Sequence, residues 1–198
     1  LRHLFEWSER DTVLNNQVYE LIPPLITAHP NQSKVHAIYG DFLYRDKRLN
    51  EAVEQWKKVI EIDPSKFLVW QYLFFASAEL ENYTELKLYG LKSTEFFPEQ
   101  PLAFYFTGMG MFYLKEYSDA VSYLKEAVGL SVDKKEIKIQ SYTLLGEAYR
   151  HMNLHAESDS AFELVLTFDP NNAMVLNNYS YYLSLRKENL EKALAMSE

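Results

Sequence analysis

The fold is decided by residues 40–64, which read GDFLYRDKRLNEAVEQWKKVIEIDP. This stretch opens on Gly40, carries Ala52 and Trp56 at helical spacing, and closes on Pro64. Prolines also stand at positions 30, 98 and 170, so the successive intervals are 34, 34 and 72 residues, and 72 is two periods of 34 plus four. A 34-residue period is typical of a helix–turn–helix repeat that stacks into a solenoid.

The same residue types recur at the same places of this period. The eighth place is glycine in three repeats, where we expect two helices to approach closely, and the twenty-fourth place is large and apolar in the same three. These residues are Gly40, Gly108 and Gly146, and Trp56, Leu124 and Phe162. The resulting repeats are 33–66, 67–100, 101–138, 139–172 and a partial one at 173–198, preceded by a degenerate remnant at 1–32.

This pattern resembles the tetratricopeptide repeat, whose motif is W-x2-L-G-x2-Y, then A-x3-F, then P. Residues 40–64 and the stretch YTLLGEAYR (142–150) match it best. The resemblance implies an all-α fold: a right-handed superhelix, or solenoid, of about five tandem antiparallel helix pairs. It also implies that the first helices of successive repeats line a concave groove.

Two departures from the pattern predict local irregularities. Pro23 and Pro24 lie within an apolar helical stretch, and because an interior proline removes a backbone hydrogen bond, we expect that helix to be kinked or split. The third repeat has four extra residues, Lys135 to Lys138. They indicate either a longer connection or an early start of the next helix.

Composition excludes several classes of protein. The net charge of −8 without a basic cluster argues against nucleic-acid binding, and the absence of cysteine excludes disulfides and thiol chemistry. No apolar run is long enough to insert directly into a membrane. The chain begins at Leu1 and its last repeat is incomplete, so we expect a segment of a longer array whose uncapped ends could bind another copy.

Catalytic and metal-binding groups are sparse. Glu147, His151 and His155 stand four residues apart and could line one helix face as metal ligands, but Asn153 should end the helix before His155. No glycine-rich phosphate loop and no grouping of nucleophile and base is present. We therefore expect no enzyme activity, no metal and no cofactor.

The resemblance assigns a partner-binding groove to the first helices. The groove places hold apolar and aromatic residues in the second and third repeats and charged or polar residues in the fourth and fifth. The predicted groove residues are Leu68, Gln71, Phe75, Leu102, Tyr105, Met109, Phe112, Tyr113, Glu147, Arg150 and Asn177. An exposed aromatic patch of this kind usually marks an interaction site.

The sequence thus favours a protein–protein interaction scaffold that binds a peptide, helix or protein without catalysis. The alternative is a structural segment of a longer repeat protein that self-associates through its ends. Residues 177–194 (NNYSYYLSLRKENLEKAL) resemble a repeat variant of bacterial, often exported, proteins. That resemblance favours a bacterial origin and an exported or periplasmic location.

Overall fold

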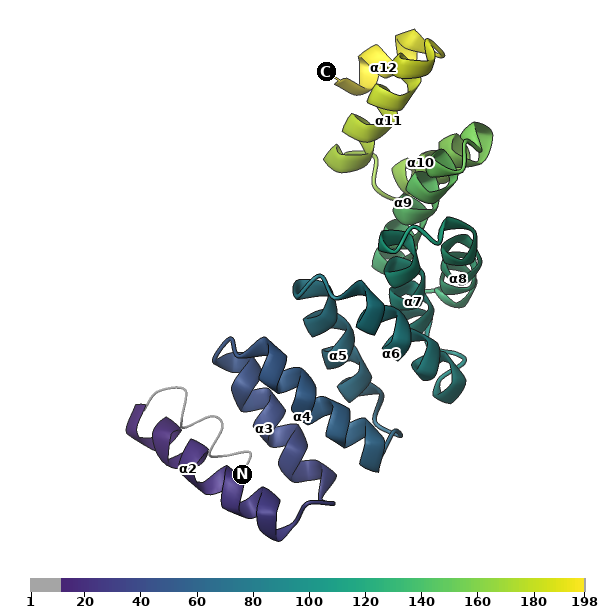
Figure 1. Ribbon diagram of the computed structural model, residues 1–198. Coiled ribbons are helices and arrows are strands. Elements are labelled where there is room, and N and C mark those ends of the chain that lie inside the picture. Colours follow the sequence, from purple (N-terminus) through teal and green to yellow (C-terminus); the bar gives the residue numbers. More distant parts are fainter. Residues whose placement is uncertain (1–11, 198) are drawn as a thin grey trace. The chain divides into compact units, whose positions relative to one another are not determined.

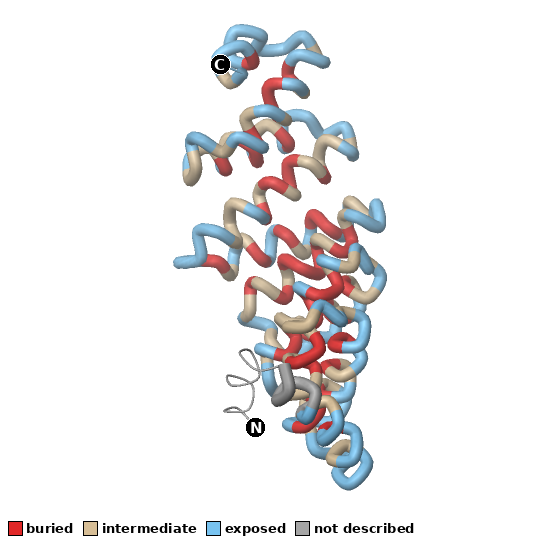
Figure 2. Tube along the Cα trace, turned by 90° about the vertical axis from the view of Figure 1, so that its left-hand side faces the viewer, coloured by how far each residue is buried: buried red, intermediate tan, exposed pale blue. Residues whose placement is uncertain are grey.

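The computed structural model describes residues 12–197, which form eleven helices and no strand (Figure 1). The all-α class predicted from the sequence is confirmed. The chain divides into two compact units, residues 1–82 and residues 83–198. The division falls inside the repeat predicted at 67–100, between its two helices. Along the helices of both units, buried residues alternate with exposed ones, as expected for amphipathic helices (Figure 2).

Unit 1 contains four helices that pack in chain order. They are α2 (Thr12–Ala28), α3 (Ser33–Arg45), α4 (Leu49–Ile62) and α5 (Phe67–Glu79). Ile22 of α2 and Phe42 of α3 are both buried and form a small core, against which Tyr19 and Ile26 pack. This core anchors the first helix of the described chain to the regular repeats that follow it.

Helix α2 continues through Pro23 and Pro24, so of the two predicted irregularities the split is wrong and the kink stays a prediction. Both prolines are exposed, and water can therefore solvate the carbonyl groups that lose their intrahelical partners. The Thr27 hydroxyl donates a hydrogen bond to the Pro23 carbonyl at 3.0 Å, while the neighbouring Ile22 stays buried. Packing on one face holds together a helix that the sequence alone would break.

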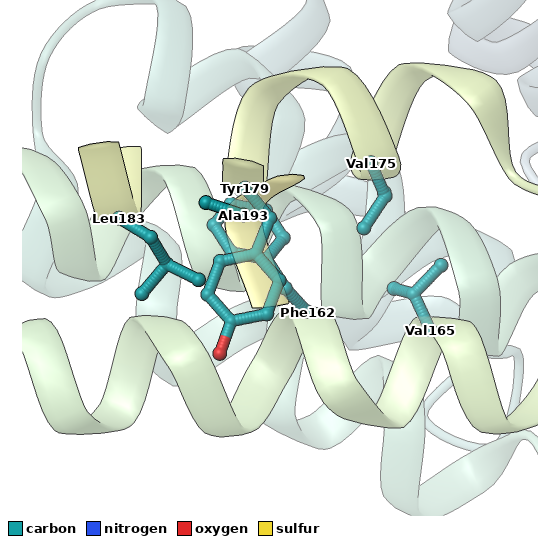
Figure 3. Packing of buried hydrophobic residues seen from close by; sticks show 6 residues of the cluster. All are labelled: Phe162, Val165, Val175, Tyr179, Leu183 and Ala193. Atoms are coloured by element: carbon teal, nitrogen blue, oxygen red, sulfur yellow. The ribbon is translucent and has the colours of Figure 1, made fainter. Parts of the chain in front are cut away.

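Unit 2 contains seven helices. They are α6 (Tyr83–Phe96), α7 (Pro101–Tyr113), α8 (Tyr117–Leu130), α9 (Lys135–His151), α10 (His155–Phe168), α11 (Ala173–Arg186) and α12 (Leu190–Ser197). Helix α9 has 17 residues where α7 has 13, so the four inserted residues start this helix early rather than lengthen the connection. Figure 3 shows part of the core, in which Phe162 of α10 lies among Tyr179 and Leu183 of α11 and Ala193 of α12.

The eighth-place glycines lie against the large residues of the twenty-fourth place. A Cβ added at Gly40 would lie 2.4 Å from Nε1 of Trp56, and one added at Gly146 would lie 2.5 Å from Cε1 of Phe162. At Gly108 it would lie 2.7 Å from Leu124. These distances are too short for any side chain. The close approach predicted from the glycines is therefore confirmed in three helix pairs.

The turn between the two helices of each repeat contains a residue with left-handed backbone conformation. These residues are Lys47, Glu81, Lys115, Asn153 and Lys187, with φ between 53° and 65°. They recur every 34 residues, as the prolines do, with four residues added between Lys115 and Asn153. None is glycine, although glycine is the residue that this conformation normally favours at a helix end.

A ring nitrogen ties the start of a first helix to the preceding proline in two consecutive repeats. Trp70 Nε1 donates to the Pro64 carbonyl at 2.8 Å, and His36 Nε2 lies 3.0 Å from the Pro30 carbonyl. Both rings occupy the fourth place of their repeat. The proline is therefore part of a hydrogen-bonded joint as well as a helix terminator.

Candidate functional site

Unit 2 contains a cavity of about 550 Å³ lined by the first helices of three successive repeats. Its walls come from α7, α9 and α11. The lining residues are Tyr105, Met109, Phe112, Tyr113, Ile139, Gln140, Thr143, Leu144, Glu147, Asn172, Met174, Asn178 and Tyr182. The volume is within the range of sites that take a small molecule or several peptide side chains.

Helix α7 supplies an apolar, aromatic wall. Tyr105 is 9% exposed, and burial raises the pKa of its hydroxyl to about 12. Tyr113 is more open and stacks on Tyr83 of α6, with ring centroids 4.2 Å apart. Phe112 packs edge-on against Tyr113 at 5.3 Å. These contacts fix the aromatic rings, so a ligand would meet a surface that is already ordered.

Glu147 is the centre of the polar wall, which α9 and α11 form together. Asn178 Nδ2 donates to Oε1 of Glu147 at 3.0 Å, and the Tyr182 hydroxyl donates to Oε2 at 2.9 Å. Arg150 Nε adds a charged hydrogen bond to Oε2 at 3.2 Å. Three donors therefore satisfy one carboxylate and hold two repeats in a fixed arrangement.

Arg150 completes this network from above the Tyr182 ring. Its guanidinium carbon lies 4.6 Å from the ring centroid, within the range of a cation–π contact. Burial and the neighbouring Glu147 charge raise the pKa of the Tyr182 hydroxyl to about 12, so this hydroxyl remains a donor. The polar wall thus has a compensated charge and fixed side chains.

An aromatic cluster borders the cavity beside Phe112. The rings of Tyr117 and His151 are parallel, with centroids 4.6 Å apart, and Phe112 lies 6.0 Å from His151. The Arg150 guanidinium donates to Nε2 of His151 at 2.9 Å. Partial burial, and then the Arg150 charge, lower the pKa of His151. The imidazole therefore acts as a neutral acceptor here.

The predicted groove residues fall into three groups. Five of them line the cavity: Tyr105, Met109, Phe112, Tyr113 and Glu147. Leu102 and Arg150, half-buried, and the exposed Asn177 lie on the same helices outside the lining. The remaining three, Leu68, Gln71 and Phe75, lie on α5 in unit 1, where Leu68 and Phe75 are exposed.

The sequence pattern missed part of the α11 wall. Asn178 and Tyr182 line the cavity, whereas the groove place identified from the sequence was Asn177, whose amide donates to Asn178 at 3.4 Å. Met174 could have been found, because it stands at the second place of its repeat. No pattern in one sequence pointed to Asn178 or Tyr182, since their partner Glu147 lies 31 and 35 residues away.

Helices α8, α9 and α10 line a second cavity, of about 390 Å³, which is mostly apolar. The sequence did not predict this cavity.

The metal-ligand positions predicted from the sequence are separated by a helix break. Helix α9 ends at His151, the backbone of Asn153 is in the left-handed conformation, and α10 begins at His155. The predicted helix break is therefore confirmed, and no three histidine or carboxylate side chains gather to hold a metal ion within residues 12–197.

Comparison with known proteins supports the helical-repeat interpretation. The family model described as "Tetratricopeptide repeat" matches residues 139–172. The chain is 31% identical over 128 residues to human tetratricopeptide repeat protein 13, an alignment that covers 64% of this chain. It spans only 14% of that relative's length.

Solved structures with the same fold extend over most of the chain. MamA of Desulfovibrio magneticus has a TM-score of 0.72 at 19% identity, covering 83% of this chain and 90% of its own. YrrB has a TM-score of 0.66 at 23% identity, with 89% and 88% covered. PilF of Pseudomonas aeruginosa has a TM-score of 0.66 at 14% identity, with 98% and 86% covered.

None of the helices described between residues 12 and 197 is both long and apolar enough to cross a membrane.

The helix pairs, the glycine contacts and the turns with left-handed residues all follow one period, and the matched family model covers one full period. Residues 139–172 thus match the tetratricopeptide-repeat family, and the chain shares the fold of tetratricopeptide-repeat proteins.

Proposed function

We propose that this chain is a non-enzymatic interaction scaffold that binds a peptide or protein segment in the cavity of unit 2. The observation that carries this proposal is the pairing of an ordered aromatic wall on α7 with a compensated polar wall on α9 and α11. Apolar side chains of a partner would contact the aromatic wall, while amide groups such as Asn178 would hydrogen-bond its polar groups. YrrB, which shares the fold, has a peptide-binding site.

The cavity is tested with a matched pair of double variants. Tyr113→Ala/Met174→Ala removes two lining side chains that are 45% and 57% exposed. Tyr181→Ala/Leu185→Ala removes a tyrosine and an aliphatic residue of similar exposure, 58% and 63%, that lie outside the cavity. Both variants should fold, because none of the four side chains is buried.

Peptides would be selected on the unmodified protein from a phage library of random sequences and then measured against both variants. We expect the cavity variant to bind them at least about thirtyfold more weakly, since truncating two contact residues costs about 2 kcal/mol or more. The control variant should bind them unchanged. Equal binding by the cavity variant and the unmodified protein would remove this cavity as the site.

A second candidate function is self-association through α11 and α12. Their exposed apolar residues are Tyr181, Leu185, Leu190 and Leu194. Light scattering at several concentrations would show a mass that rises with concentration and becomes constant in Tyr181→Ala/Leu185→Ala. The same two double variants therefore separate the two functions. The bacterial origin and the exported or periplasmic location favoured by the sequence stay predictions.

A further inference from the structure

Asp41 is a half-buried carboxylate in unit 1 with little to compensate its charge. It lies on α3 at the ninth place of its repeat, the place that Glu147 occupies in unit 2. Trp56 Nε1 donates to its Oδ1 at 3.3 Å, a long hydrogen bond. Among the described residues, no lysine, arginine or histidine forms an ion pair with Asp41.

The surroundings of Asp41 are aromatic. The buried Trp56 ring stacks on Tyr72 of α5 with centroids 5.0 Å apart, and Tyr44 of α3 lies 5.5 Å from Trp56. Burial raises the pKa of the Asp41 carboxyl to about 6, against the lowering effect of the Trp56 hydrogen bond. Burial and the Asp41 charge raise the pKa of Tyr72, so the phenol beside the carboxylate stays neutral.

The comparison with Glu147 shows what Asp41 lacks. Glu147 receives hydrogen bonds from Arg150, Asn178 and Tyr182, one of which carries a full positive charge. From residues 12–197, Asp41 receives one hydrogen bond, from the neutral indole of Trp56. A carboxylate that is withdrawn from water without a cation reduces the stability of the free protein. Side chains kept at such a cost are candidates for ligand binding.

We infer that Asp41, together with the half-buried Tyr72, binds an arginine side chain of a partner polypeptide. The guanidinium would supply the charged hydrogen bonds that Asp41 lacks, and its planar face suits the Tyr72 ring, whereas the buried Trp56 ring holds the carboxylate through its N–H. The net charge of −8 favours approach of a basic partner. The site lies within unit 1, so it stands whether or not the cavity of unit 2 binds a partner.

The Trp56 indole offers a direct probe of this site, because its N–H donates to the carboxylate. The indole N–H of Trp70 offers an internal control, because it is bonded to the Pro64 carbonyl in the same unit. The full chain, labelled with ¹⁵N at its tryptophan indoles, would be titrated by NMR with the peptide acetyl-Ala-Arg-Ala-amide. The matched control peptide replaces arginine by citrulline, which keeps the shape and removes the charge.

We expect a saturable shift of the Trp56 resonance with the arginine peptide, at a Kd of about 1–10 mM for a single anchoring residue. The Trp70 resonance should stay in place. The Asp41→Asn variant should bind the arginine peptide about tenfold more weakly or worse, the loss expected for a hydrogen bond between two charged groups. The citrulline peptide should produce no saturable shift with the unmodified protein, because it lacks the positive charge that Asp41 would pair with.

A second measurement uses only the unmodified protein. Lowering the pH from 7 to 5 protonates a carboxyl whose pKa is about 6, so affinity for the arginine peptide should fall by about tenfold. Three results would each overturn the inference: no saturable Trp56 shift, an equal shift with citrulline, or an arginine affinity that is the same at both pH values. A finding that phage-selected peptides do not bind the unit 2 cavity would have no bearing on the arginine site at Asp41.

Discussion

Replacing Gly146 by alanine tests whether the close contact between paired helices limits the sequence. The added methyl carbon would lie 2.5 Å from Cε1 of Phe162 and 2.8 Å from Cδ1 and Cζ. The Phe162 ring is fully buried, with the Tyr179 ring 5.5 Å away and the Tyr182 ring 6.0 Å away, so it has no open side to move toward. Overpacking of this kind costs about 1–3 kcal/mol.

Alanine also has a higher helix propensity than glycine, which returns about 1 kcal/mol. We therefore expect Gly146→Ala to lower the free energy of unfolding by up to about 2 kcal/mol. Gly129 on α8 is the matched control, because a methyl group there would meet nothing within 4 Å. Gly129→Ala should raise the free energy of unfolding by up to about 1 kcal/mol, since only the propensity gain applies.

Urea unfolding followed by far-UV circular dichroism measures both changes, with the midpoint of Gly146→Ala below that of Gly129→Ala at equal slope. The double variant Gly146→Ala/Phe162→Leu should lose less stability than the two single variants lose in total, because the smaller leucine makes room for the methyl group. The reasoning is refuted if Gly146→Ala and Gly129→Ala stabilise the protein equally.

Three further predictions concern stability. Trp70→Phe should cost more than about 1 kcal/mol in urea unfolding, because it removes the 2.8 Å hydrogen bond to the Pro64 carbonyl and also leaves a cavity where the buried indole lay. Lys115→Gly should raise the free energy of unfolding by up to about 1 kcal/mol, since glycine adopts the left-handed backbone at φ 65° without strain. A free energy of unfolding below that of the unmodified protein would show that Lys115 is not strained there. Asp41→Asn should be more stable than the unmodified protein at pH 7. This difference in the free energy of unfolding should shrink as the pH falls below about 6. The reason is that the raised pKa makes folded Asp41 bind a proton more tightly than unfolded Asp41 does, so protonation stabilises the unmodified protein. A stability difference that does not change with pH would contradict this prediction.

The architecture could be predicted because it depends on local, repeated constraints. Gly40 and Trp56 report a close helix contact by size alone, and Pro64 reports the end of a helix. The four inserted residues allowed two interpretations, and the structure assigns them to the start of α9. The split predicted at Pro23 is wrong, because the packing of Ile22 against a neighbouring helix outweighs a local rule.

The candidate site was less predictable because it depends on how each helix is rotated about its axis. Groove places carried over from one repeat to the next identified Met109 and Glu147 but gave Asn177 where Asn178 lines the cavity. Tyr105 lines the cavity, but most of its side chain is buried. Such details follow from contacts between residues far apart in sequence, which a repeat pattern does not contain.

The bonds around Glu147 also have a mechanical consequence. They join α9 to α11 through two side chains that hold the same carboxylate, so pulling these two repeats apart must break the bonds of Asn178 and Tyr182 together. Each repeat of such an array contacts only its neighbours, so the array deforms by small rotations between adjacent repeats. Under load, we expect this pair of repeats to yield after its neighbours, which would keep the polar wall of the cavity in shape while the array around it bends.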